Sequence, residues 1–299
     1  MVKKIKKFFL FFLLLFILFS ASLLFLSIFY IRELPRPEFF TERLLSQSTK
    51  IYDKTGKILL YEIFGEEKRT FVPLSLIPEK LKQAVLVAED SNFYHHRGLE
   101  IKGLARAMIE NLKRGKPIYG GSTISQQLIR STFLSSEKTL NRKIKEIILT
   151  LELERKYSKD QILEWYLNQV PFGQNAYGVE AASQTYFRKT VSELNLAEMT
   201  TLASLIKAPY KFSPYDEIGK KYLFERRKYI LDKMLEKGYI SKEEYEESLD
   251  YNLTFAPKKI EIKAPYFTLW VVNELEKKFG RDFLTKAGFK VYTTLNWEW

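Results

Sequence analysis

Three short stretches combine carboxylates, cations and polar groups that could carry out chemistry. Residues 89–98 begin with an adjacent acid pair and contain two histidines, and the glycine-rich residues 120–127 follow about twenty positions after the end of that stretch. A third stretch, residues 142–146, adds three cations and another carboxylate. A carboxylate can move a proton, and hydroxyls, amides and cations can surround an anion. The residue types therefore favour acid–base chemistry on a negatively charged substrate.

Glu89 is the first candidate for the acid–base group. It follows a predicted helix that begins near Pro78. The apolar side chains of this helix recur on one face, at Leu81, Ala84, Val85 and Ala88. The apolar wall, the negative end of the helix and the neighbouring Asp90 should all favour the protonated form of Glu89 and raise its pKa. The alternative is a helix end with two solvated acids.

The two later stretches predict an anion cradle. Hydroxyls and amides donate to phosphoryl oxygens, and cations offset the charge that a leaving phosphate develops. The predicted members are Ser122, Thr123, Gln126, Gln127, Arg130, Arg142 and Lys143. Glu146 is a second carboxylate beside them, and its alternative role is an i,i+4 ion pair with Arg142 on a wet surface.

Composition excludes several classes of function. The 299 residues are 46% hydrophobic and 15% aromatic, enough for a buried core. With no cysteine, the chain has no disulfide, no thiolate metal site and no cysteine nucleophile. Its net charge of +12 suits an anionic membrane surface or a phosphate-bearing substrate. No nucleic-acid-binding motif accompanies that charge, and no HExxH pattern supports a zinc site at His95 and His96.

The N-terminus predicts a membrane anchor. Four lysines lie within residues 1–7, and residues 8–31 carry no charge. Roughly 24 helical residues span about 36 Å, enough to cross a hydrocarbon core of about 30 Å. The lysines orient the N-terminus to the cytoplasm and place everything after Arg32 outside it, away from ATP, NAD and the genome. A cleaved signal peptide is the alternative, although its apolar region is usually shorter.

The rest of the chain reads as a mainly α domain between two smaller segments. Residues 32–69 predict a linker with two short strands around a turn within residues 51–60. Residues 70–250 predict helices, with Ser136, Ser158, Ser192 and Ser241 as their N-caps. In residues 251–299, strand-like alternation at 258–263 and 288–295 flanks a short helix near 271–279.

In this order, the three chemical stretches resemble the glycosyltransferase family 51 domain of bacterial peptidoglycan polymerases. Residues 166–178 match a further family segment, in which Asn168 and Gly173 shape the substrate site. Residues 264–267 and 288–295 resemble the connector to the transpeptidase of class A penicillin-binding proteins. The SxxK and KTG motifs of a transpeptidase occur only in reversed order, at residues 135–138 and 54–56. The transpeptidase domain is therefore expected to be missing from this chain.

The resemblance implies a lysozyme-like helical glycosyltransferase domain that polymerises lipid II into glycan strands. Glu89 would be the base, and the donor's polyprenyl diphosphate would leave with inversion at the anomeric carbon. Glu146 would lie near the diphosphate, where it would orient the cations or help to hold Mg²⁺ or Mn²⁺, with Asp90 as the other metal candidate. Asn168 joins the predicted substrate-binding residues, and no organic cofactor is expected.

The implied setting is the outer face of the bacterial cytoplasmic membrane, crossed once. Expected partners are lipid II, the growing strand and phosphoglycolipid inhibitors such as moenomycin, and no nucleic acid. Two alternatives remain open at this point: a lysozyme-like muramidase that uses Glu89 as general acid, and a noncatalytic cell-wall scaffold.

Overall fold

The computed structural model describes residues 47–65, 67–101, 121–134, 139–258 and 262–297, with isolated positions 13, 14, 17, 18, 103, 109 and 137. Within these residues, no helix is both long enough and apolar enough to cross a bilayer. The predicted anchor at residues 8–31 lies outside the described residues except at four positions, and the predicted cytoplasmic tail lies wholly outside them.

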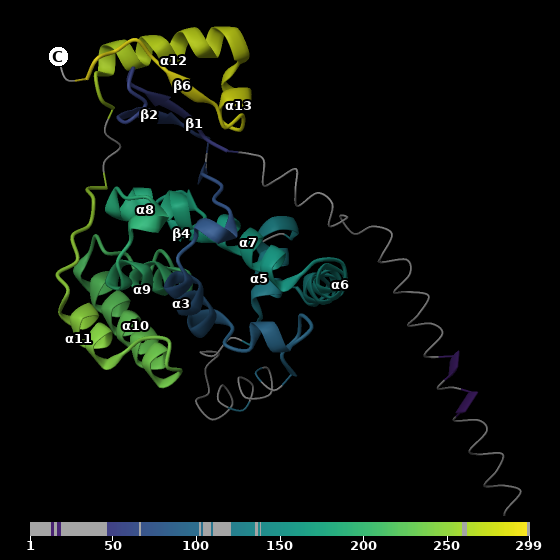
Figure 1. Ribbon diagram of the computed structural model, residues 1–299. Coiled ribbons are helices and arrows are strands. Elements are labelled where there is room, and N and C mark those ends of the chain that lie inside the picture. The colour runs from purple at the N-terminus through teal and green to yellow at the C-terminus, as the bar shows by residue number, and fades with distance from the viewer. Residues whose placement is uncertain are drawn as a thin grey trace, which may run out of the picture.

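Helices make up most of the described chain, as the sequence predicts (Figure 1). The longer ones are α3 (Glu79–Glu89), α5 (Ile124–Phe133), α6 (Leu140–Lys156), α7 (Lys159–Gln169), α8 (Val179–Phe187), α9 (Leu196–Leu205), α10 (Glu217–Glu236), α11 (Lys242–Asp250) and α12 (Pro265–Phe279). The single turns are η1 (Leu74–Leu76), η2 (Phe93–His95), η3 (Val191–Glu193) and the four-residue α13 (Arg281–Leu284).

Side-chain caps set where these helices begin. Ser158 and Ser241 form capping boxes at α7 and α11, which confirms both predictions. The other two predicted caps are wrong. Thr139 caps α6, three residues beyond Ser136, and Asn195 caps α9, because Ser192 lies inside the separate turn η3. In each case a second residue with a hydroxyl or amide side chain nearby is an equally good cap by type.

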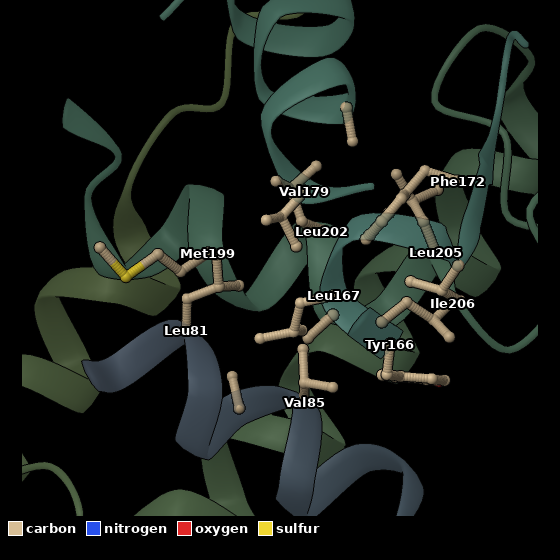
Figure 2. Packing of buried hydrophobic residues seen from close by; sticks show 14 of the residues in the cluster. Leu81, Val85, Tyr166, Leu167, Phe172, Val179, Met199, Leu202, Leu205 and Ile206 are labelled. Carbon is tan, nitrogen blue, oxygen red and sulfur yellow. The ribbon is translucent and has the colours of Figure 1, made fainter. Parts of the chain in front are cut away.

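One hydrophobic core joins the helices from α3 to α11. Figure 2 shows apolar side chains of α3, α7 and α9 meeting in it, among them Val85, Leu167 and Leu202. Leu81, Ala84 and Val85 are fully buried, as the period of the predicted apolar face requires. The core fixes the direction of α3 and hence the place of Glu89 at its end.

A second, smaller core lies beside a three-stranded sheet of order β2-β1-β6. Strand β1 (Thr49–Tyr52) pairs antiparallel with β2 (Leu59–Ile63) and parallel with β6 (Lys290–Tyr292). Helices α12 and α13 lie on this sheet at one end of the molecule (Figure 1). The predicted linker and the predicted connector thus share one sheet, although each was expected to be a separate segment. Of the predicted strands near the C-terminus, residues 259–261 lie outside the described residues.

The helical domain has a small sheet of its own, of order β3-β5-β4. Strand β3 (Lys68–Arg69) pairs parallel with β5 (Ala176–Tyr177), and β5 pairs antiparallel with β4 (Pro171–Gly173). This sheet attaches the chain before α3 to the turn after α7, so it helps to hold the entry to α3 in place.

Candidate active site

Glu89 is the last residue of α3, and side chains from two other helices contact its carboxylate. Gln127 of α5 donates a hydrogen bond from Nε2 to Glu89 Oε2 at 3.1 Å. Arg226 of α10 places Nη2 3.5 Å from Glu89 Oε1. The Glu89 side chain is 10% exposed, so the carboxylate is nearly enclosed yet retains access to solvent.

Burial raises the pKa of Glu89, while Arg226, the hydrogen bond from Gln127 and the charge of Lys207 act in the opposite direction. Burial is the largest of these effects, so the pKa stays above the ordinary value for a glutamate. The sequence predicted this direction from the apolar wall, the helix end and Asp90, and burial is the cause that the structure supports. A carboxyl with a raised pKa binds a proton more readily than an ordinary glutamate, which suits proton transfer.

Asp90, the C-cap of α3, connects two of the motifs. Its Oδ2 accepts a hydrogen bond from the backbone N–H of Ile124, at the start of α5, at 3.0 Å. His96 Nδ1 accepts from the Gly98 backbone N–H, so Nε2 carries the proton and donates to Asp90 at 3.0 Å. A carboxylate at a helix N-terminus is favoured by the helix dipole. Asp90 therefore ties residues 89–98 to the start of α5.

Gly98 completes this connection between the two motifs. Its φ of +87° favours glycine, and an added Cβ would come within 2.9 Å of Thr150 Cγ2 on α6. The Gly98 carbonyl oxygen accepts a 2.6 Å hydrogen bond from Thr123 Oγ1. The close packing that glycine permits thus brings α6, with its cations, against the end of the motif that starts at Glu89.

Glu146 is the centre of a cation cluster on α5 and α6. Its side chain is fully buried, and Lys143 Nζ donates to Oε1. Arg142 Nη1 lies 3.8 Å and Arg130 Nη1 4.0 Å from Oε2. Three cations converge on one carboxylate, so the cluster keeps an excess of positive charge. The predicted i,i+4 ion pair with Arg142 is present, but the predicted wet surface is wrong, because none of the Glu146 side chain is exposed.

Helix α5 connects the two carboxylates. Gln127 contacts Glu89 and Arg130, one turn later, lies beside Glu146. Lys143 also reaches the glycine-rich stretch, where its Nζ lies 3.5 Å from Ser122 Oγ. Glu89, Ser122, Gln127 and the cations around Glu146 are thus joined through contacts on one helix and its N-terminal loop.

Three predicted substrate-binding residues have hydrogen-bond partners within the protein. Thr123 and Gln126 form the capping box of α5, where Gln126 Oε1 accepts from the Thr123 backbone N–H at 3.0 Å. Asn168 is buried and its amide is fully used: Oδ1 accepts from Val72 N, and Nδ2 donates to Val72 O and Glu164 O. These side chains hold loops and helices in place, and their contact with substrate stays a prediction from the sequence.

The described residues do not fit a divalent metal. Among them, no group of three or more histidines, aspartates or glutamates is arranged to hold an ion. The three cations beside Glu146 would repel a metal there, and Asp90 is hydrogen-bonded to His96 and Ile124. A metal at Glu146 or Asp90 stays a prediction from the sequence, and no step below uses one.

A cavity of about 510 Å³ lies elsewhere, between β2 and α8. Its lining includes Glu62, Lys68 and Arg188 but none of the predicted site residues. Converging chemical groups, rather than this cavity, therefore locate the candidate site.

Comparison with known proteins agrees with this geometry. Residues 56–235, which include both carboxylates and all the cations named above, match the transglycosylase family profile. The chain belongs to the transglycosylase family. Its transglycosylase domain is a peptidoglycan glycosyltransferase domain, as the three motifs predicted.

Relatives of the transglycosylase chain share this domain. It is 40% identical to penicillin-binding protein 1A of Aquifex aeolicus over 279 residues, which is 93% of this chain and 38% of the relative. It is 42% identical to penicillin-binding protein 1A of Haemophilus influenzae over 253 residues, 84% of this chain and 29% of the relative. The chain thus spans about a third of the length of these curated relatives. The crystal structure of the Haemophilus influenzae protein aligns with 85% of this chain and 28% of its own, at 30% identity and a TM-score of 0.45.

Sequence reasoning missed two cations of the transglycosylase domain. Arg226 lies 137 positions from Glu89 in the chain and reaches it from α10, and the charge of Lys207, just after α9, lowers the pKa of Glu89. Arg226 belongs to the run 225–228 on a long charged helix, a pattern typical of a solvated surface. Only the packing of α10 against α3 distinguishes it from its neighbours.

Proposed function

We propose that this chain polymerises lipid II into glycan strands, with Glu89 as the base. The observation that supports the proposal most is the pairing of a nearly enclosed carboxylate of raised pKa with a cation cluster reached through the same helix, α5. The first group suits proton transfer from a sugar hydroxyl. The second suits the departure of a diphosphate.

In this reaction the Glu89 carboxylate takes the proton of the acceptor sugar's 4-hydroxyl. The hydroxyl oxygen forms a bond to the anomeric carbon of the donor sugar as the bond from that carbon to the diphosphate oxygen breaks. The electron pair of the broken bond leaves on the polyprenyl diphosphate, and attack from the opposite face inverts the anomeric centre. Gln127 keeps the carboxylate oriented during the transfer.

The leaving diphosphate gains negative charge, which the cations around Glu146 offset. Lys143 is half exposed and lies between Glu146 and Ser122, so its ammonium group is available to a phosphoryl oxygen. Arg142 and Arg130 add two further positive charges beside the same carboxylate. Glu146 holds the three cations together, a positioning role for which its burial and its neighbours are suited.

A muramidase could also use Glu89, because a raised pKa suits a general acid. Hydrolysis of a glycan, however, releases a sugar hydroxyl and no phosphate, so it has no need for the cation cluster. A noncatalytic scaffold would need neither group. The cluster at Glu146 therefore favours polymerisation over both alternatives.

The substrate's lipid would stay in the bilayer while its sugars reach the site. We infer a single N-terminal anchor at residues 8–31, a cytoplasmic N-terminus and an extracytoplasmic domain, from the charge pattern of the sequence. A phosphoglycolipid such as moenomycin should compete for the cation cluster, because it presents a phosphate attached to a lipid and sugars.

Product analysis with purified full-length chain in detergent tests the proposal. Lipid II should be converted to strands longer than the disaccharide, and Glu89→Gln should lower the rate by at least about a hundredfold, the usual scale of general-base catalysis. Shortening of preformed glycan, with no extension of lipid II, would establish the muramidase instead. Near-normal polymerisation by Glu89→Gln would place the base elsewhere.

A further inference from the structure

Arg226 makes two contacts at the end of α3, one to the backbone and one to the Glu89 side chain. Its Nη2 donates a 2.7 Å hydrogen bond to the Ala88 carbonyl oxygen and lies 3.5 Å from Glu89 Oε1. The carbonyls in the last turn of a helix have no partner within the helix, and cations are favoured there. Arg226 therefore supplies a hydrogen bond that α3 lacks, at the residue before Glu89.

The arginine itself is held firmly. Its side chain is 14% exposed, its guanidinium lies 5.1 Å from the centre of the Tyr229 ring, and the buried Nε has no hydrogen-bond partner among the described residues. Burying a guanidinium with an unpaired donor costs stability. The cost is retained beside the candidate base, which indicates that Arg226 does more than fill space.

We propose that Arg226 is a positioning residue for Glu89: it fixes the end of α3 through Ala88 and keeps a positive charge beside the carboxylate. The proposal rests on the role given to Glu89 above. It assigns α10, which none of the chemical motifs includes, to the reaction machinery.

The other groups around Glu89 do not replace this function. Gln127 on α5 is neutral, and Tyr166 on α7 acts only through Gln127. Asp90 is bound to His96 and to the start of α5. Lys207 contributes charge to Glu89, but within the described part of the chain it makes no ion pair or hydrogen bond with it. Arg226 alone among these cations combines charge with direct contact.

The contact between Arg226 and Glu89 determines in which direction the loss of Arg226 changes the pKa of Glu89. Arg226 favours the ionised form of Glu89, so its removal should raise the carboxyl pKa further. A base with a higher pKa requires a higher pH to lose its proton. In Arg226→Gln, the acid limb of the pH–rate profile should therefore move to higher pH, and the rate at neutral pH should fall about ten- to a hundredfold, the scale of one charge-assisted hydrogen bond.

The decisive measurement is infrared titration of the Glu89 carboxyl band in the full-length chain, because it does not depend on turnover. The band is assigned by its loss in Glu89→Gln. Its midpoint should move to higher pH in Arg226→Gln and stay close to the wild-type value in Arg226→Lys, which keeps the charge. An unmoved midpoint in Arg226→Gln would overturn the proposal, whatever the enzyme's activity.

Two neighbours provide matched controls. Arg227 is also buried, and its Nη2 donates to the Leu249 carbonyl oxygen at 3.1 Å, so Arg227→Gln removes a comparable backbone contact on α11 instead of α3. Lys228 is exposed and pairs with Asp232, so Lys228→Gln removes one surface charge of the same helix. Neither should move the midpoint. An equal shift in Arg227→Gln would mean that Arg226 acts through the stability of α10, and the proposal would fail.

Polymerisation assays of the same set separate this inference from the proposed function. A wild-type chain that titrates as expected but does not extend lipid II would contradict the proposed function and leave the Arg226–Glu89 relationship supported. If the wild-type chain polymerises lipid II and the pH–rate profile of Arg226→Gln is unchanged, the proposed function stands and Arg226 has no part in it.

Discussion

The hydroxyl of Tyr166 donates a 3.0 Å hydrogen bond to Gln127 Oε1, and this bond determines which way the Gln127 amide faces. With its oxygen engaged, the amide presents Nε2 to Glu89. Burial raises the pKa of Tyr166 well above its ordinary value, so the hydroxyl keeps its proton throughout the physiological range. Tyr166, deep in the core shown in Figure 2, thus orients the partner of the candidate base.

Tyr166→Phe should therefore slow polymerisation about three- to tenfold, although Tyr166 touches no substrate group in the proposed reaction. Without the hydroxyl, the Gln127 amide can turn its oxygen toward Glu89 and repel the carboxylate. The expected loss of rate corresponds to about one neutral hydrogen bond. Rates of the folded variant against wild type check this. Tyr186→Phe is the matched control, since its buried hydroxyl donates to the Phe172 carbonyl oxygen. An equal loss of rate in both variants would contradict a specific role for Tyr166.

Lys143→Ala should slow polymerisation by roughly one to three powers of ten, because it removes a charge-assisted contact to a group that gains charge in the transition state. Steady-state rates with lipid II provide the measurement. Arg155→Ala is the control on the same helix, since Arg155 forms an exposed pair with Glu152. If Lys143→Ala turns over like Arg155→Ala, the cation cluster does not hold the leaving diphosphate.

Glu89→Gln should make the protein more stable at neutral pH and leave its stability nearly unchanged at acid pH. Because burial raises the folded-state pKa of Glu89, its stabilising contribution is complete below the unfolded value and is lost as the pH rises through the folded value. Glutamine does not ionise, so the variant loses no stability at this position as the pH rises. The difference in melting temperature between variant and wild type should therefore grow from about pH 4, near the unfolded pKa, to pH 8.

Glu193 supplies a control of opposite sign for that experiment. Hydrogen bonds from the backbone and side chain of Thr190 lower the pKa of Glu193, so its ionised form stabilises the fold at neutral pH and this contribution is lost on acidification. Glu193→Gln should lower the melting temperature at neutral pH and have a smaller effect at acid pH. A pH-independent difference for Glu89→Gln would show that its burial does not penalise the charge.

Asn168→Ala should lower the free energy of unfolding. The substitution leaves the buried Val72 N–H and C=O without their side-chain partner, at a cost of about 2–4 kcal/mol in the free energy of unfolding. Denaturant unfolding measures this loss, and the exposed Asn252→Ala should show almost none. A normal unfolding free energy combined with a raised KM for lipid II would instead support the substrate-binding role that the motif suggested.

Much of this molecule could be predicted from local pattern. The period of apolar residues placed Glu89 at the end of a helix, and two capping boxes located α7 and α11. Gln127, Arg130, Arg142 and Lys143 were assigned to one cluster from residue type and motif order, and they meet around Glu89 and Glu146. These predictions succeed because helix period, caps and charged side-chain types act over short distances in the chain.

Only the tertiary structure decided the rest. It showed that Thr123, Gln126 and Asn168 form hydrogen bonds with backbone groups. It joined β1 to β6 across most of the chain, and it brought Arg226 to Glu89. A hydrogen-bonding side chain can serve a substrate or a backbone group equally well by type, and long-range pairing depends on how whole helices pack. The sequence by itself determined the chemical groups and the helix that ends at the candidate base, whereas packing determined which of those groups meet.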